Sequence, residues 1–292
     1  MGGFGVEMSF IERLRLSSQK WIQRRAYPLP VFKLEPNFKV TEQLATPFTL
    51  FGSVNRRLLQ GIASELKRIT DRYPGLAAHL YYGESPDDSA CARPWMHSNQ
   101  LRCGIQVSLG ATSSERLYET EHELGHTLTY LRGVPMGISP KINELFSWLQ
   151  SFGTHPAVDQ TIVECGGDHL PRQRRNMELI LATGWRESNE LFDPIMLGCA
   201  IFDACRPVPE YREAALRMAR SASKTAAEAF VTIWVRYEET KNEILTPSGV
   251  KRFVELCMQD FGVGGGARLI TIDELIAEGD KPPCRDAPAS MS

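Results

Sequence analysis

"YETEHELGHTLTYLRG", residues 118–133, contains two histidines four positions apart, with a glutamate directly after the first. In an α-helix, residues four apart lie one turn apart on the same face. His122 and His126 could then both reach one zinc ion at about 2.0–2.1 Å. The spacing therefore predicts a metal-binding helix.

The flanking residues predict that this helix runs from about 113 to 132. Thr112 and Glu115 form a capping-box pattern, and Gly133 suits the left-handed residue that often ends a helix. At about 100° per residue, the leucines gather on one face and the two histidines on roughly the opposite face. Two hypotheses fit this arrangement: a polar face that meets water, or a face that lines a metal-containing cleft.

The glutamate between the histidines favours the metal hypothesis. Glu123 can reach a water activated by the metal without becoming a ligand, and can pass the proton to the leaving amine. In a sequence with this many histidines, two histidines at this spacing with a glutamate directly after the first arise by chance in roughly one sequence in a hundred. A strand is also expected directly before the helix, because apolar and polar residues alternate from Leu101 to Leu109. We therefore expect Zn2+ bound by His122 and His126, with Glu123 as the general base.

"HELGH" following "IQVS" resembles the zincin metallopeptidases, and the gluzincin branch and the ImmA/IrrE-type peptidases are the most similar. The resemblance covers about residues 100–150. It implies an α+β fold with a zincin-like core, made of a small mixed sheet, an active-site helix and a ligand helix. The activity it implies is zinc-dependent hydrolysis of peptide bonds.

The resemblance to gluzincins implies that the third zinc ligand is a glutamate on the next helix. Glu144 lies 18 residues after His126, and Asn143-Glu144 resembles the pair that opens the ligand helix of gluzincins. The similarity ends at Trp148, where some members carry an aspartate that orients a zinc histidine. Candidates for that orienting role are Asp159, Glu164 and Asp168. Glu144 could instead be an exposed carboxylate near the start of its helix.

His155, in "THPAVDQ", is the main alternative to Glu144 as third ligand, Asp159 is a weaker one, and Asp168-His169 is weaker still. If Glu144 is the ligand, we expect His155 to be a catalytic residue that donates a hydrogen bond to the oxyanion of the tetrahedral intermediate. A purely structural role for this histidine also fits. Tyr130 could act on the oxyanion in the same way, or could be a packing residue.

The chain divides into four expected parts. An N-terminal arm covers 1–48, a zincin-like metallopeptidase core 49–170, a helical C-terminal subdomain 171–280 and a disordered tail 281–292. In the core, "LAAHLYY" predicts a strand before a polar loop from Gly83 to Asn99. Helices are expected at 141–152, 173–183, 209–240, 248–260 and 272–278. "GVGGGA" at 262–267 lacks the context of a nucleotide-binding loop and is expected to be a flexible connection.

The composition excludes several classes of protein. Of the 292 residues 42% are hydrophobic and 23% charged, and the net charge of −2 gives no basic field for nucleic acid. Seven cysteines without a CxxC pair favour reduced thiols and a cytoplasmic location. No apolar stretch is long enough to cross a membrane, and the first residues lack the apolar run of a signal peptide.

Two functions remain from different classes. In the first, a zinc metallopeptidase binds a peptide or protein substrate in extended form along the strand Leu101 to Leu109, which should then lie at a sheet edge. In the second, a non-catalytic regulatory or interaction protein retains a zincin-like core and binds a protein partner through its helical C-terminal half. Glu123 argues for the first, because a structural metal site has no use for a general base.

Overall fold

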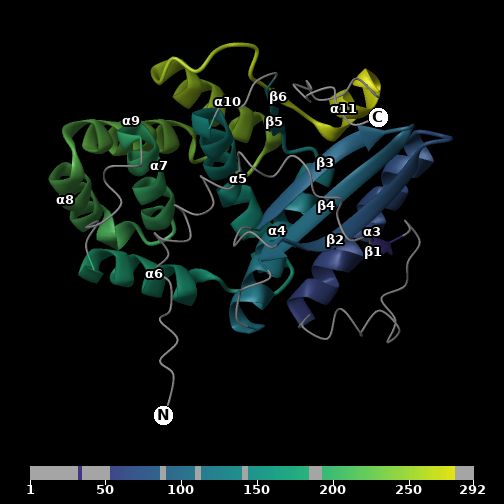
Figure 1. The fold of residues 1–292 in the computed structure, drawn as a ribbon, viewed down its shortest axis with the longest axis horizontal. Coiled ribbons are helices and arrows are strands. Elements are labelled where there is room, and N and C mark those ends of the chain that lie inside the picture. The colour runs from purple at the N-terminus through teal and green to yellow at the C-terminus, as the bar shows by residue number, and fades with distance from the viewer. Residues whose placement is uncertain are drawn as a thin grey trace, which may run out of the picture.

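The computed structural model describes residues 32–34, 53–85, 90–108, 113–139, 144–183 and 193–279. Most of the expected N-terminal arm, the expected tail, the Thr112 cap and Asn143 lie outside these residues. Figure 1 shows an α+β arrangement, with one small sheet beside a larger assembly of helices. No helix in the described ranges combines the length and the apolar character needed to span a bilayer.

The sheet has four strands in the order β1 (Phe32–Leu34), β2 (Ala77–Ser85), β4 (Gln100–Ser108) and β3 (Cys91–His97). β2 and β4 are parallel, whereas β1 and β3 run antiparallel to their neighbours. The alternation predicted for β4 is confirmed, since Leu101, Cys103, Ile105 and Val107 are all buried. The sheet is therefore small and mixed, as expected.

The expected position of this strand in the sheet is wrong. β4 is paired on both sides, with β2 and with β3, so it lies in the interior and has no free edge for a peptide. Within the described residues, the strand at this end of the sheet is β3.

The polar loop expected from Gly83 to Asn99 is also wrong, because β3 lies within this range. Its sequence, "CARPWMH", contains Pro94, which argues against an interior strand but is tolerated at an edge. Ser98 and Asn99, with φ of 49° and 57°, form the two-residue connection from β3 to β4. Two consecutive residues with positive φ match the tight hairpin turn that suits the twist of paired strands.

Two helices pack on one face of the sheet. α3 (Ser53–Arg72) and α4 (Ser113–Leu131) contact each other, and α4 also contacts β3 and β4. Leu58 and Ile62 of α3, Leu124 and Leu128 of α4 and the inward side chains of β4 form one apolar core. The helix predicted over 113–132 is therefore confirmed, with Leu124, Leu128 and Leu131 buried.

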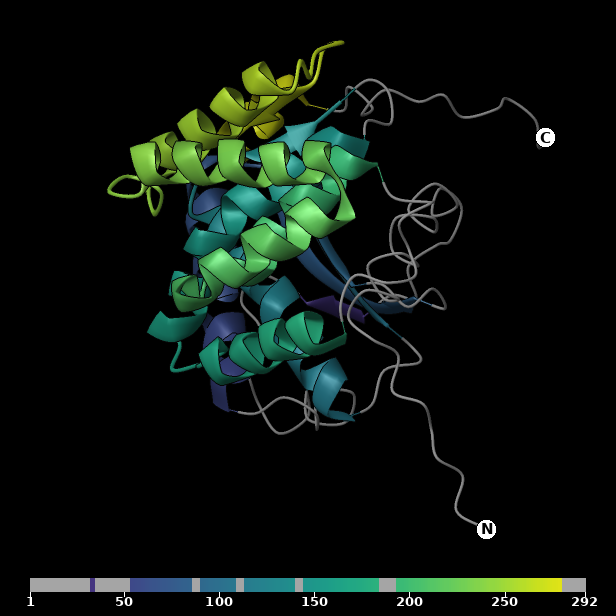
Figure 2. The same ribbon diagram turned by 90° about the vertical axis from the view of Figure 1, so that its left-hand side faces the viewer.

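The remaining helices form a second apolar core (Figure 2). They are α5 (Glu144–Glu164), α6 (Leu170–Thr183), α7 (Pro194–Cys205), the short 3-10 helix η2 (Pro209–Tyr211), α8 (Arg212–Ala222), α9 (Lys224–Thr240) and α10 (Pro247–Asp260). β5 (Met136–Ile138) pairs antiparallel with β6 (Arg268–Ile270), and α11 (Ile272–Glu278) follows. Because α4 packs on α5, the two cores meet along these two helices.

The helices expected at 173–183, 248–260 and 272–278 are confirmed to within three residues, and 262–267 is a connection as expected. Three expectations fail. The helix expected to end near 152 continues to Glu164 with Pro156 inside it. The single helix expected over 209–240 is interrupted at Ser223, whose hydroxyl caps α9. α7 was not expected at all.

Candidate metal centre

Much of the polar face of α4 is buried, and His122 is half-buried. Glu123 and His126 are 6% and 5% exposed, and Thr127 and Thr129 are also buried. The sheet, α3 and α5 each contact this helix, so the histidine side faces α5 instead of bulk solvent. The hypothesis that the histidines occupy an ordinary water-facing surface is therefore wrong.

A glycine lets α5 approach this face closely. A Cβ placed on Gly125 would lie 3.0 Å from side-chain carbons of Val158 and Ile162 of α5. The hydroxyls of Thr129 and Thr161, 3.0 Å apart, form a hydrogen bond between the same two helices. The close contact of α4 with the middle of α5 positions His155 opposite the HELGH segment.

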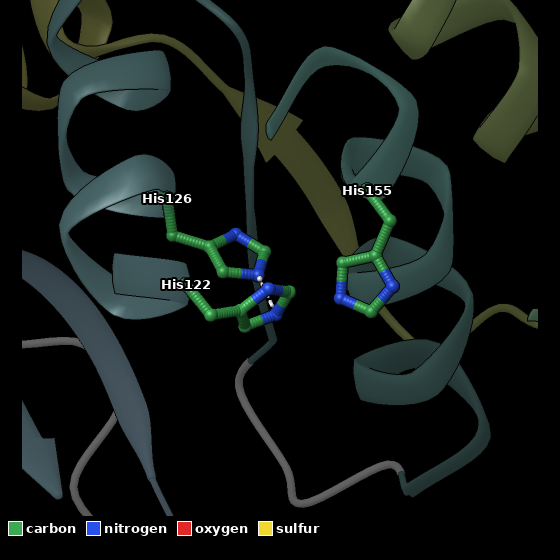
Figure 3. Close-up of side chains that lie close together, drawn as sticks. All are labelled: His122, His126 and His155. Atoms are coloured by element: carbon green, nitrogen blue, oxygen red, sulfur yellow. Dashed lines mark hydrogen bonds between the residues drawn. The ribbon is translucent and has the colours of Figure 1, made fainter. Parts of the chain in front are cut away.

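Three histidines converge at this contact. The ligand atoms of His122, His126 and His155 all lie within 4.8 Å of one another. The ring centroid of His155 is 4.9 Å from that of His122 and 5.2 Å from that of His126. Figure 3 shows the His155 ring of α5 turned toward the pair on α4.

The spacing of the α4 pair fits one metal ion. Nε2 of His122 and Nε2 of His126 are 3.2 Å apart. Two nitrogen ligands of a tetrahedral zinc ion, each at about 2.0–2.1 Å, are separated by about 3.3 Å. Both Nε2 atoms could therefore bind one ion with little movement.

The surroundings of the α4 pair keep its imidazoles neutral. Burial, followed by the neighbouring His155, lowers the pKa of His122 to about 3. Burial also lowers the pKa of His126 well below its ordinary value, and His122 and His155 add to this effect. Neutral imidazole is the form that binds metals, so both side chains are ready to act as ligands near neutral pH.

His155 is held by a carboxylate from α7. Its Nδ1 lies 2.8 Å from Oδ1 of Asp203. Burial opposes ionisation of Asp203, but His155 and Arg206 together lower the pKa of this carboxyl below its ordinary value. The orienting aspartate was missed by sequence reasoning, because it stands alone in the apolar segment "GCAIFD" and α7 itself was not predicted.

Glu144, the expected third ligand, is not part of this group of three. It is the first described residue of α5, eleven positions before His155, which corresponds to about 16 Å along the helix axis. The middle of α5, rather than its start, crosses α4. His155, the main alternative to Glu144, is the residue that lies with His122 and His126.

The other candidates have partners elsewhere. Asp159 pairs with Arg206 and accepts from Gln173. Glu164 pairs with Arg132 at the end of α4, and Asp168 caps the first turn of α6. The hydroxyl of Tyr130 accepts a hydrogen bond from Gln150, which supports its interpretation as a packing residue.

A second polar group lies beside His122. It contains His169, one of the weaker ligand candidates, which is not part of the group of three. Nε2 of His169 lies 2.9 Å from a carboxylate oxygen of Glu121. The ring of Tyr118 packs between His169 and His122, with the guanidinium of Arg172 3.9 Å from its centre. No sequence pattern signals this cluster, because His169 and Arg172 follow α5 in the chain.

Three imidazoles, two of them neutral through burial, converge from two helices and could hold a metal ion. Comparison of the whole chain with protein-family models, with curated proteins and with solved structures found no match.

Proposed function

We propose that this chain is a zinc-dependent metallopeptidase in which His122, His126 and His155 hold the metal and Glu123 is the general base. The observation that carries the proposal is the convergence of the three histidines, with the glutamate of the HELGH segment between two of them. A site that is only structural does not require this glutamate. Catalytic zinc sites typically combine three protein ligands with one open position.

The donor set favours zinc over the hard cations. Imidazole nitrogens suit zinc and other transition metals, whereas magnesium and calcium prefer oxygen ligands. A zinc ion bound here would supply Lewis acidity, which activates water and polarises a scissile carbonyl.

The role proposed for Glu123 is proton transfer. It lies on α4 directly after His122 and is 6% exposed, so its carboxylate works in surroundings with little bulk water. In the proposed reaction Glu123 takes a proton from the attacking water and delivers it to the leaving amine nitrogen. Its burial strengthens electrostatic interactions with the reacting groups.

The proposed substrate is a peptide bound in extended form, and β3 replaces β4 as the strand beside it. β3 is the edge strand next to β4, and it packs against α4, which carries two of the three histidines. A peptide could add to this edge through main-chain hydrogen bonds. Pro94 lacks an N–H group, so pairing would use the other residues of the strand.

Two measurements test the proposal. Metal analysis of the purified full-length protein should give about one zinc per chain, lost in His155→Ala and kept in His97→Ala. His97 is a matched control because it is an exposed histidine outside the group of three. Near-stoichiometric zinc in His155→Ala would refute the ligand set.

Catalysis is tested separately, with a library of fluorogenic peptides. Glu123→Gln should keep zinc and lose hydrolysis by several orders of magnitude, whereas Glu115→Gln, on the same helix, should keep both. A protein that binds zinc but cleaves no peptide in the library would favour the alternative, a non-catalytic interaction protein. Equal hydrolysis by wild type and Glu123→Gln would refute the role of this glutamate.

A further inference from the structure

The three histidines differ in what their second ring nitrogen contacts. Nδ1 of His122 and Nδ1 of His126 are buried and have no hydrogen-bond partner within the part of the chain that the structure describes. Nδ1 of His155 instead lies 2.8 Å from the Asp203 carboxylate. Metal-binding histidines usually give their other N–H to such a group, which fixes the tautomer and the ring orientation.

The contacts of His155 define its tautomer. An ionised carboxylate only accepts hydrogen bonds, so in the neutral His155 ring the proton lies on Nδ1 and the lone pair on Nε2. In this tautomer the hydroxyl of Ser151, 3.3 Å from Nε2, is the donor of that contact. In Figure 3 one nitrogen of the His155 ring faces the α4 histidines and the other points away from them.

Asp203 is itself held in place by a second polar contact between α5 and α7. Arg206, three residues after Asp203, lies 2.7 Å from the carboxylate of Asp159, which is one helical turn after His155. The Arg206 side chain is only 7% exposed. The pairs His155–Asp203 and Asp159–Arg206, together called the α5–α7 clamp, therefore connect the two helices beside the metal ligands.

We propose that Asp203 is a positioning residue for metal binding. It holds the His155 ring with Nε2 directed at His122 and His126, and so makes α7 part of the metal centre. The inference rests on the proposed function only in assuming that the three histidines bind a metal. Under this proposal, metal binding also requires that α7 is folded and packed against α5.

The test measures affinity of the full chain for Zn2+ alone, by competition with a chromophoric chelator. Asp203→Ala should weaken binding by about 10- to 100-fold. Asp203→Asn keeps an acceptor oxygen of the same size but loses the negative charge, so its loss should be smaller, about two- to tenfold. The visible spectrum of the Co2+-loaded protein should change in both variants, because the third ligand is reoriented.

Asp260→Ala is the matched control. Asp260 links α9 to α10 through Arg236, and its side chain is 21% exposed against 20% for Asp203. Its loss should disturb helix packing in a comparable way while leaving zinc affinity and the Co2+ spectrum unchanged. An equal loss of zinc in Asp260→Ala would overturn the proposal, because general loosening of the helices would then explain both.

The remaining outcomes separate this inference from the proposed function. If Asp203→Ala binds zinc within twofold of wild type while His155→Ala does not bind, the positioning role is refuted and the metal centre stands. If His155→Ala binds zinc as wild type does, the ligand set of the proposed function is refuted. If circular dichroism shows that Asp203→Ala does not fold, wild-type affinity in Asp203→Asn with an unchanged Co2+ spectrum overturns the proposal.

Discussion

Removal of zinc should lower the thermal stability of the protein measurably. His126 and His155 are 29 residues apart in the chain and meet only because α4 packs on α5. The complete ligand set therefore exists in the folded state and not in the unfolded chain. A ligand that binds only the folded state stabilises it by mass action.

The size of the effect follows from the zinc concentration. At free zinc one hundred times the dissociation constant, the gain is about 2.7 kcal/mol. For a chain of 292 residues, with about 2.1 cal/mol/K of unfolding entropy per residue, that corresponds to about 4 °C in Tm. If His155→Ala weakens binding about 100-fold, the same free zinc equals the new dissociation constant, and the gain falls to about 0.4 kcal/mol.

The assay is differential scanning calorimetry of chelator-treated protein, with and without buffered zinc. Wild type and Glu144→Ala should show the full shift in Tm, and His155→Ala should show at most about a fifth of it. A full shift in His155→Ala, or its loss in Glu144→Ala, would refute the assignment of His155 as third ligand. No shift in wild type would refute the metal centre.

Three further predictions concern packing and charge. Gly198→Ala should destabilise the fold by up to about 2 kcal/mol in urea unfolding, because the new Cβ would lie 2.4 Å from a backbone oxygen of α9. Overpacking of this kind costs about 1–3 kcal/mol, and the higher helix propensity of alanine offsets about 1 kcal/mol of it. Tyr130→Phe should cost about 1 kcal/mol, since Gln150 loses its acceptor, with zinc affinity unchanged. The pKa of Asp260 is lowered by its hydrogen bond to Arg236, so its stabilisation is present at neutral pH and lost as the pH falls below about 4. Asp260→Asn should therefore reduce the difference in Tm between pH 7 and pH 3.

Each of these predictions has a result that contradicts it. Unchanged urea stability in Gly198→Ala would mean that α7 and α9 separate without cost. Weaker zinc binding in Tyr130→Phe would give that hydroxyl a role at the metal. An unchanged difference in Tm in Asp260→Asn would show that the ion pair contributes nothing measurable.

The elements that carry the two α4 histidines could be predicted from sequence, because their signals are local. The leucine spacing and the terminal residues define α4, and strict alternation defines β4. β3 was missed because Pro94 normally argues against a strand, and only its place at the edge makes the proline acceptable. α7 was missed because its run of apolar residues, interrupted by Gly198, has no polar face.

The third ligand could not be predicted from spacing alone. Glu144 has the expected position in sequence, but the ligand depends on which part of α5 crosses α4. Gly125 allows that crossing near Val158 and Ile162, a tertiary contact that no local pattern encodes. The role of Asp203 depends in turn on the packing of α7 against α5.

The position of the α4 histidines between two apolar cores implies a conflict between thermal stability of the metal-free fold and the proposed activity. Among the described residues the two Nδ1 atoms have no hydrogen-bond partner, and each buried polar group of this kind costs about 1–3 kcal/mol. Without zinc, leucine at 122 and 126 would remove that cost, so selection for thermal resistance in the metal-free state would favour a chain without the HELGH pair. A directed-evolution experiment that screens only for heat tolerance in the presence of a zinc chelator should therefore discard these histidines before it alters the surrounding leucines.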